Sequence, residues 1–367
     1  IFPFPLDDFQ LEAIDALNQG HSVVVSAPTG SGKTLVGEYA IHRALAHGQK
    51  VFYTTPLKAL SNQKLRDFRE AYGDDNVGLM TGDLSVNREA SIVVMTTEIF
   101  RNMLYAEASE QDDPLADVEA VVLDECHYMN DSQRGTVWEE SIIHCPPSVQ
   151  LVALSATVAN AGQLTDWIEK VHGPTTLVLS DHRPVPLQFS FCSAKGLHPL
   201  LNDAGTGLHP NCKVWRAPKG HKRKGRSAKP PQPEPPPISF VVAQMAERDM
   251  LPAIYFIFSR RGCDKAVRDL GIQCLVNKEE QARIRARLKA YSSDNPEAVR
   301  DGIHADALLR GIAAHHAGVL PAWKELIEEL FQQGLVKVVF ATETLAAGIN
   351  MPARTTVIAA LSKRTER

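Results

Sequence analysis

Apolar and polar positions alternate in two ways along the 367 residues of this chain. Short runs of uninterrupted apolar residues predict buried strands of a parallel sheet, because helices cover both faces of such a sheet. Between these runs, apolar residues recur every three or four positions, which predicts helices with one buried face. In the first half of the chain we predict strands at 22–26, 50–54, 91–95, 119–123, 149–154 and 174–179. The helical patterns include 6–19, 58–70 and 134–143.

A second alternation of the same kind begins near Ile238. It predicts strands at 253–258, 311–318, 336–340 and 355–360, and helices at 263–270 and 278–292. The fold class is therefore α/β, with two parallel-sheet units in tandem. We expect a first domain at 1–182, a linker at 183–237 and a second domain at 238–367.

The predicted linker differs in composition from both units. Proline punctuates residues 181–187, and turn-forming residues at 193–210 predict a hairpin. Residues 211–237 are predicted to be disordered, because 211–230 carry eight Lys or Arg and no acid, and a proline-rich run follows. This basic insert could add salt-dependent affinity for nucleic-acid phosphates, or it could be a solvated loop without a partner.

Composition sets only broad limits on function. Hydrophobic residues make up 44% and charged residues 22% of the chain, as in an ordinary globular protein. The net charge of −4 gives no general sign of nucleic-acid binding, which would have to come from local patches. No apolar run reaches the ~18 residues that span a bilayer, and the scattered cysteines are predicted to be reduced thiols. Because the chain begins at Ile1, we expect further residues upstream.

The first candidate site is the glycine-rich segment 26–34, between an apolar run and a helical pattern. Gly30 and Gly32 would let the backbone turn tightly and bring N–H groups to phosphate oxygens. Lys33 would reach the β- and γ-phosphates, and the Thr34 hydroxyl would bind Mg²⁺. An ordinary strand-to-helix turn is the alternative. The residues predicted to bind nucleotide here are Thr29, Gly30, Ser31, Gly32, Lys33 and Thr34.

The second candidate site follows the apolar run 119–123, which ends in an acidic pair. Asp124 is predicted to hold Mg²⁺, mostly through water, and Glu125 to orient or deprotonate the attacking water. His127 could couple the site to whatever moves during turnover. The alternative is a solvated acidic strand end.

Near the start of the chain, Phe4 and Gln10 could stack on an adenine and hydrogen-bond to it. The alternative is that Phe4 belongs to the core and that Gln10 is solvated.

Taken in order, these segments resemble the motifs of superfamily-two helicases of the DExH type, and most closely those of the superkiller-type RNA helicases. Within that family the resemblance is strongest to cyanobacterial and chloroplast members. The segments that carry it are 4–10, 27–34, 55–60, 81–83, 96–98, 124–127, 155–157, 259–264 and 341–352.

The resemblance implies two RecA-like domains in tandem, the second truncated at its C-terminus, with ATP and Mg²⁺ as cofactors. It implies that Gly348 and Asn350 face the nucleotide. A further motif, whose arginines stabilise the transferring phosphoryl group, is expected beyond Arg367. We therefore expect this chain to bind nucleotide but to hydrolyse it and unwind duplexes poorly.

The resemblance also implies backbone contacts to a single strand. The residues concerned are Pro56, Lys58, Gly82, Thr96, Thr97, Ser259, Arg260 and Thr342. Hydroxyl residues and helix N-termini bind phosphate oxygens without reading bases, although each Thr or Ser could instead be a helix cap. His315 and His316 are expected to be structural or to contact the backbone, and not to bind metal.

The activity that the resemblance implies is that of an ATP-dependent RNA helicase core, moving 3′-to-5′ on single-stranded RNA. A DNA helicase of the same family and a non-enzymatic RNA-binding scaffold are the alternatives. We expect a monomer without a membrane partner, associated with RNA-processing or degradation proteins. The expected location is the bacterial cytoplasm or, alternatively, the chloroplast.

Overall fold

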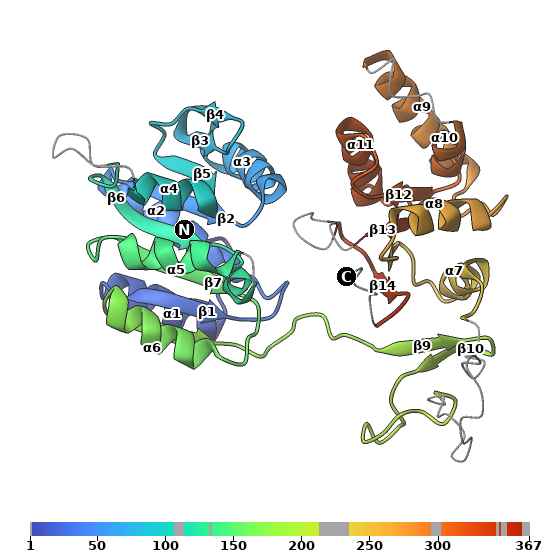
Figure 1. Cartoon of the computed structure of the whole chain (residues 1–367), viewed down its shortest axis with the longest axis horizontal. Helices are drawn as coiled ribbons and strands as arrows, with labels where there is room; N and C mark the ends of the chain where they lie inside the picture. Colours follow the sequence, from blue (N-terminus) through green and yellow to red (C-terminus); the bar gives the residue numbers. More distant parts are fainter. Residues whose placement is uncertain are drawn as a thin grey trace, which may run out of the picture. The chain divides into compact units, whose positions relative to one another are not determined.

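A computed structural model describes residues 2–105, 114–131, 134–212, 235–294, 302–342, 345 and 351–361. The chain forms two compact units, Ile1–Pro186 and Leu187–Arg367 (Figure 1). Each unit contains a parallel sheet with helices on its faces, which confirms the predicted fold class.

The sheet of the first unit has eight strands in the order β4-β3-β5-β2-β6-β7-β1-β8. All pairs are parallel except that of β3 and β4. The strands are β1 (Ser22–Ser26), β2 (Lys50–Thr55), β3 (Val77–Met80), β4 (Ser85–Val86), β5 (Ile92–Thr96), β6 (Val118–Leu123), β7 (Gln150–Ser155) and β8 (Thr175–Leu179). The six predicted strands are confirmed, whereas β3 and β4 escaped prediction because they are short and Gly78 interrupts the apolar run of β3.

Helices cover both faces of this sheet (Figure 1). The first face carries α1 (Asp8–Asn18), α2 (Thr34–His47) and α3 (Lys58–Tyr72). The second carries α4 (Thr97–Tyr105), α5 (Gly135–His144) and α6 (Ala161–Val171). A short 3₁₀ helix, η2 (Cys126–Asn130), follows β6, and another, η1 (Asp74–Asn76), precedes β3.

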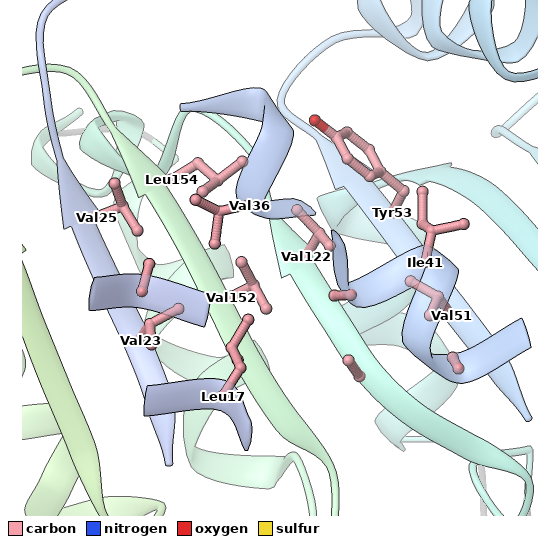
Figure 2. Packing of buried hydrophobic residues seen from close by; sticks show 14 of the residues in the cluster. Leu17, Val23, Val25, Val36, Ile41, Val51, Tyr53, Val122, Val152 and Leu154 are labelled. Carbon is pink, nitrogen blue, oxygen red and sulfur yellow. The ribbon is translucent and has the colours of Figure 1, made fainter. Parts of the chain in front are cut away.

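Successive residues of each central strand point to opposite cores. Val23 and Val25 of β1 pack beneath α1 and α2 in the cluster of Figure 2, whereas Val24 belongs to the cluster on the opposite face, with Trp138 and Phe100. Because both faces are buried, the central positions of such a strand are apolar, and this explains the uninterrupted runs in the sequence.

The second unit has a four-stranded parallel sheet in the order β12-β13-β11-β14. Its strands are β11 (Ala253–Phe256), β12 (Ile312–His315), β13 (Val338–Ala341) and β14 (Thr355–Ile358). Its helices are α7 (Ile238–Glu247), α8 (Arg260–Asp269), α9 (Lys278–Asp294), α10 (Gly302–Leu308) and α11 (Pro321–Gln332). The helix predicted at 263–270 begins three residues earlier, because the Ser259 hydroxyl caps it by accepting the Gly262 amide at 3.1 Å.

An antiparallel hairpin precedes α7 in the second unit. It pairs β9 (Ser190–Ser193) with β10 (Gly196–Pro199), so the hairpin predicted at 193–210 begins earlier, and a bridge from Leu201 to Leu208 closes a second turn. The Arg248 guanidinium donates to the Leu197 carbonyl at 2.9 Å, which fixes the hairpin beside α7. Most of the predicted basic insert, 213–234, lies outside the described residues.

In the part of the chain that the structure describes, no helix combines the length and the apolar character needed to cross a bilayer.

We predict that Gly135→Ala destabilises the first unit by about 1–3 kcal/mol. A Cβ on Gly135, at the start of α5, would lie 2.2 Å from the Met129 carbonyl oxygen of η2, so this backbone must shift. Urea denaturation followed by circular dichroism measures the change. The matched control is Gly162→Ala in the first turn of α6, where a Cβ would meet nothing within 4 Å and stability should rise by ~0.5 kcal/mol. Equal stability of the two variants would contradict the prediction.

Candidate nucleotide site and nucleic-acid interface

The strand order brings the predicted nucleotide-binding segments to one edge of the sheet. Strands β6, β7 and β1 are consecutive neighbours, with Ser26 of β1 in register with Ser155 of β7. Since the carboxyl ends of parallel strands share an edge, the glycine-rich loop after β1, Asp124 after β6 and residues 155–157 after β7 lie together.

The glycine-rich loop offers unpaired amides. Gly30 and Gly32 both have φ of +83°, a conformation that side chains disfavour. The backbone N–H groups of Gly30, Gly32, Lys33 and Thr34 have no acceptor among the described residues. Lys33 is only 6% exposed and immediately precedes α2, so its charge adds to that of the helix N-terminus. A loop of this kind fits a phosphate group.

Gln10 supports this loop from α1. Its side chain is 5% exposed, and its Oε1 accepts the Asp7 amide at 2.9 Å. Its Nε2 donates to the Gly32 carbonyl at 3.1 Å, and a Cβ on Gly32 would lie 2.9 Å from that nitrogen. The Phe4 ring is 53% exposed, and its centroid is 6.0 Å from that of Phe2. The adenine contacts of Phe4 and Gln10 stay predictions.

Asp124 is held by two hydrogen bonds. Its carboxylate is 6% exposed; Oδ2 accepts the Tyr53 hydroxyl at 2.8 Å, and Oδ1 accepts the Glu125 amide at 2.9 Å. These bonds fix the rotation of the carboxylate. The sequence analysis did not identify Tyr53. The available signal was a tyrosine inside a buried strand, because a buried phenol needs a polar partner.

Glu125 occupies a left-handed backbone conformation, with φ of +53° and ψ of +43°. Burial, and then the neighbouring Asp124 carboxylate, raise the pKa of Glu125, while Lys33 and Lys64 act in the opposite direction. A raised pKa makes the carboxylate a better proton acceptor, which suits a general base.

His127 connects the loops after β6 and β7. Its Nδ1 lies 3.2 Å from Glu125 Oε2 and accepts the Ala156 amide at 3.4 Å. Burial, and then the Lys33 charge, lower the pKa of His127, so the ring is neutral near pH 7. A movement of residues 155–157 would therefore act on Glu125 through this ring.

The residues at this edge fit a magnesium ion bound together with nucleotide. Thr34 is half-buried, and the Ser31 hydroxyl and the Thr54 hydroxyl are buried without a partner among the described residues. Over the same residues there is no cluster of three or more His, Cys, Asp or Glu side chains that could hold a metal alone. Mg²⁺ characteristically takes one or two protein oxygens and completes its shell with water and phosphate, as Thr34 and Asp124 would allow.

The other half of the edge, after β3, β5 and β2, carries the residues predicted to bind a single strand. Lys58 is half-exposed and forms an ion pair with Asp83. A Cβ on Gly82 would lie 3.7 Å from Lys58 Nζ, so Lys58 and Gly82 are neighbours. The structure therefore brings together two predicted contacts that lie far apart in sequence.

Thr96 and Thr97 are less accessible than a direct phosphate contact through the side chain requires. Thr96 is 6% exposed, and Thr97 is fully buried and donates its hydroxyl to the Thr55 carbonyl at 3.2 Å. The Thr97 hydroxyl thus holds β2 and α4 together, and only the backbone at the start of α4 remains for a ligand.

Arg134 joins the predicted single-strand contacts to one another. Its guanidinium donates to the Pro56 carbonyl at 2.7 Å and to the Glu98 carboxylate. Pro56 follows β2 and Glu98 lies in the first turn of α4, so one side chain fixes both segments. Sequence reasoning missed Arg134, because nothing in its local pattern indicates these partners.

In the second unit, Ser259 is the α8 cap described above, and Arg260 is exposed beside Gly318. The Thr342 amide donates to the His315 carbonyl at 3.4 Å. Gly348 and Asn350 lie outside the described residues.

The two adjacent histidines of the second unit each contact a carboxylate. His315 Nε2 lies 2.8 Å from Glu328 and His316 Nε2 lies 2.9 Å from Asp264. These contacts agree with the structural role expected for both.

Comparison with known proteins identifies the family that this chain resembles. Residues 7–164 match the family model of the DEAD/DEAH box helicase. The chain is 49% identical over 402 residues to the chloroplastic DExH-box ATP-dependent RNA helicase DExH15 of Arabidopsis thaliana, covering 99% of this chain and 34% of that protein.

Two further relatives extend this comparison. The chain is 47% identical over 385 residues to the probable helicase HelY of Mycobacterium tuberculosis, covering 98% of this chain and 42% of that protein. It is 42% identical over 368 residues to the human exosome RNA helicase MTR4, covering 96% of this chain and 34% of that protein. The chain thus spans between 34% and 42% of the length of these three relatives.

We predict that Glu125→Gln stabilises the protein at neutral and alkaline pH. Folding raises the pKa of Glu125, so ionising it costs folding free energy above its unfolded pKa of about 4.3, and this cost is complete above the raised pKa. Glutamine removes the cost. The rise in Tm, measured by differential scanning fluorimetry, should be present at pH 8 and disappear as the pH falls below about 4.3. The exposed Glu70→Gln is the control; a pH-independent difference for Glu125→Gln would contradict the prediction.

We predict that Arg134→Met weakens binding of single-stranded RNA about 10-fold, or ~1.4 kcal/mol. The variant loses both bonds that position Pro56 and Glu98. Fluorescence anisotropy with labelled RNA measures the change. Arg101→Met is the matched control, because Arg101 bridges α4 to Glu140 of α5 at 3.4 Å without contacting the segment at Pro56. Unchanged RNA affinity in Arg134→Met would refute the role of Arg134.

Proposed function

The chain belongs to the superkiller-type DExH-box helicases of superfamily two, and from that premise we propose that it is the core of an ATP-dependent RNA helicase. The observation that carries the proposal is the meeting of the glycine-rich loop, Asp124–Glu125 and His127 at one sheet edge. The DExH-box relatives named as RNA helicases support RNA as the substrate.

In this proposal the first unit binds ATP. The free amides of the glycine-rich loop and the Lys33 ammonium hold the phosphates, and Phe4 and Gln10 hold the adenine. Thr34 and Asp124 hold Mg²⁺, which supplies positive charge to the phosphate oxygens.

Glu125 is the proposed base. Its carboxylate accepts a hydrogen bond from the attacking water and takes its proton as the water oxygen bonds to the γ-phosphorus. The bond from that phosphorus to the bridging oxygen of ADP breaks in the same step, so ADP and phosphate are released. The His127 ring lies beside the Glu125 carboxylate and accepts the Ala156 amide, so it stands between Glu125 and the loop after β7.

The proposed RNA site runs along the half of the edge formed by β3, β5 and β2. Its contacts come from Pro56, Lys58 and Gly82, from the backbone at Thr96–Thr97, and from Ser259, Arg260 and Thr342 in the second unit. Contacts of this kind bind the backbone without reading sequence. Gly348 and Asn350 are proposed to face the nucleotide from the second unit. Nucleotide-driven closure of the two domains would then give 3′-to-5′ movement along RNA and duplex unwinding.

The proposal also covers the domain boundaries, the oligomeric state, the partners and the location of the protein. Domain 1–182 would bind ATP, 183–237 would be the linker, and 238–367 would be the helicase C-terminal domain. We propose a monomer that works with RNA-processing or degradation proteins. The bacterial cytoplasm is the proposed location, with the chloroplast as the alternative, since relatives occur in bacteria and one is named chloroplastic.

ATP hydrolysis with single-stranded RNA, with single-stranded DNA and with neither, at matched salt, tests the proposal. The assay uses this chain and, in parallel, a continued chain that carries the arginine motif implied by the resemblance. We expect stimulation by RNA, and a loss of at least about 100-fold in Glu125→Gln with ATP binding retained.

Two outcomes would overturn the proposal. Equal or stronger stimulation by DNA would favour a DNA helicase of the same family. Absence of hydrolysis with either nucleic acid in the continued chain would favour a non-enzymatic RNA-binding scaffold.

A further inference from the structure

A side-chain hydrogen bond connects the half of the sheet edge proposed to bind RNA with the half proposed to bind nucleotide. Strand β2 leads into the proposed RNA-binding segment, and its neighbour β6 leads into the proposed nucleotide site. Tyr53 of β2 donates its hydroxyl proton to Asp124 Oδ2 at 2.8 Å. Because β2 and β6 pair in parallel, with Thr54 opposite Leu123, the pairing itself places Tyr53 near Asp124.

The Tyr53 ring is held rigidly. The side chain is fully buried, and Figure 2 shows it within the cluster beneath α2, with its hydroxyl oxygen towards the carboxyl ends of the strands. Phe68 of α3 packs edge-on against it, with ring centroids 5.0 Å apart, and Lys64 Nζ lies 5.4 Å from the Tyr53 centroid. A ring fixed on several sides presents its hydroxyl at a fixed point.

The Tyr53 hydroxyl restricts the orientation of the Asp124 carboxylate, which would bind the metal. With Oδ2 accepting from Tyr53 and Oδ1 accepting from the Glu125 amide, Asp124 retains one defined orientation. Each oxygen keeps a further lone-pair direction for a magnesium-bound water. Groups that orient a metal ligand in this way raise metal affinity, because less freedom is lost on binding.

We propose that Tyr53 is a positioning residue for the magnesium-binding carboxylate of Asp124, acting through its hydroxyl. The inference rests on the proposed function, since it takes the site to bind Mg²⁺ with nucleotide. It also joins the two halves of the edge: a shift of β2 or of the segment that begins at Pro56 moves the Tyr53 hydroxyl and with it Asp124.

The test measures how much Mg²⁺ strengthens nucleotide binding by the whole 367-residue chain. The dissociation constant of fluorescent ADP is measured in EDTA and in saturating Mg²⁺, and their ratio is the magnesium gain. Tyr53→Phe keeps the ring and its packing but removes the hydroxyl. We expect its magnesium gain to fall about 10-fold, with the EDTA value unchanged.

Tyr39→Phe is the matched control. The Tyr39 hydroxyl also donates to a side-chain oxygen in the same unit, that of Asn18 at 2.7 Å, but lies outside the site, so the gain should stay at the wild-type value. If Tyr53→Phe does not fold, Phe68→Leu replaces it, because loosening the ring should at least halve the gain.

The outcomes distinguish failure of the positioning role of Tyr53 from failure of the proposed function. A wild-type gain that persists in Tyr53→Phe, or an equal loss of affinity with and without Mg²⁺, would overturn the positioning role alone. If Phe68→Leu is used instead, an unchanged magnesium gain in that variant would also overturn the positioning role. Absence of any gain in the wild type would overturn the proposed magnesium site and this inference with it.

Discussion

The parallel pairing of β1, β7, β6 and β2 is the constraint on which the candidate site depends. A parallel ladder places the carboxyl ends of all its strands at one edge, and the register from Ser26 to Ser155 and from Thr54 to Leu123 sets their heights. Residues 33, 55, 124 and 155 become neighbours only through this pairing. Because both faces of these strands are buried, a slip of one residue would exchange the two cores, so the register is strongly fixed.

Polar groups at the edge are supported from beneath by the two cores. Gln10 reaches the glycine-rich loop from α1, Tyr53 reaches Asp124 from the cluster under α2, and Gly135 lets α5 approach η2 behind His127. The first two contacts each tie a residue proposed to act on nucleotide to a rigid element. Supports of this kind keep a carboxylate or a loop in one geometry, which reduces the entropy lost when a charged ligand binds.

The half of the edge proposed to bind nucleotide and the half proposed to bind RNA are connected through shared elements of the sheet. Strand β2 belongs to both, since Tyr53 contacts Asp124 whereas Pro56, three residues later, is held by Arg134 beside Glu98. A displacement of the segment after β2 therefore has a short route to the proposed metal ligand. His127 supplies a second route, between Glu125 and the loop after β7.

The sequence alone determined the α/β class, six of the eight strands in the first sheet, and the glycine-rich and acidic segments, because these depend on local periodicity and on residues adjacent in the chain. It missed β3 and β4, which are too short to show a period. Only the tertiary structure decided that Tyr53 meets Asp124, that Arg134 joins Pro56 to Glu98, and that the Thr97 hydroxyl is turned inward. These contacts depend on strand order and on the depth of each side chain, and no local pattern encodes either.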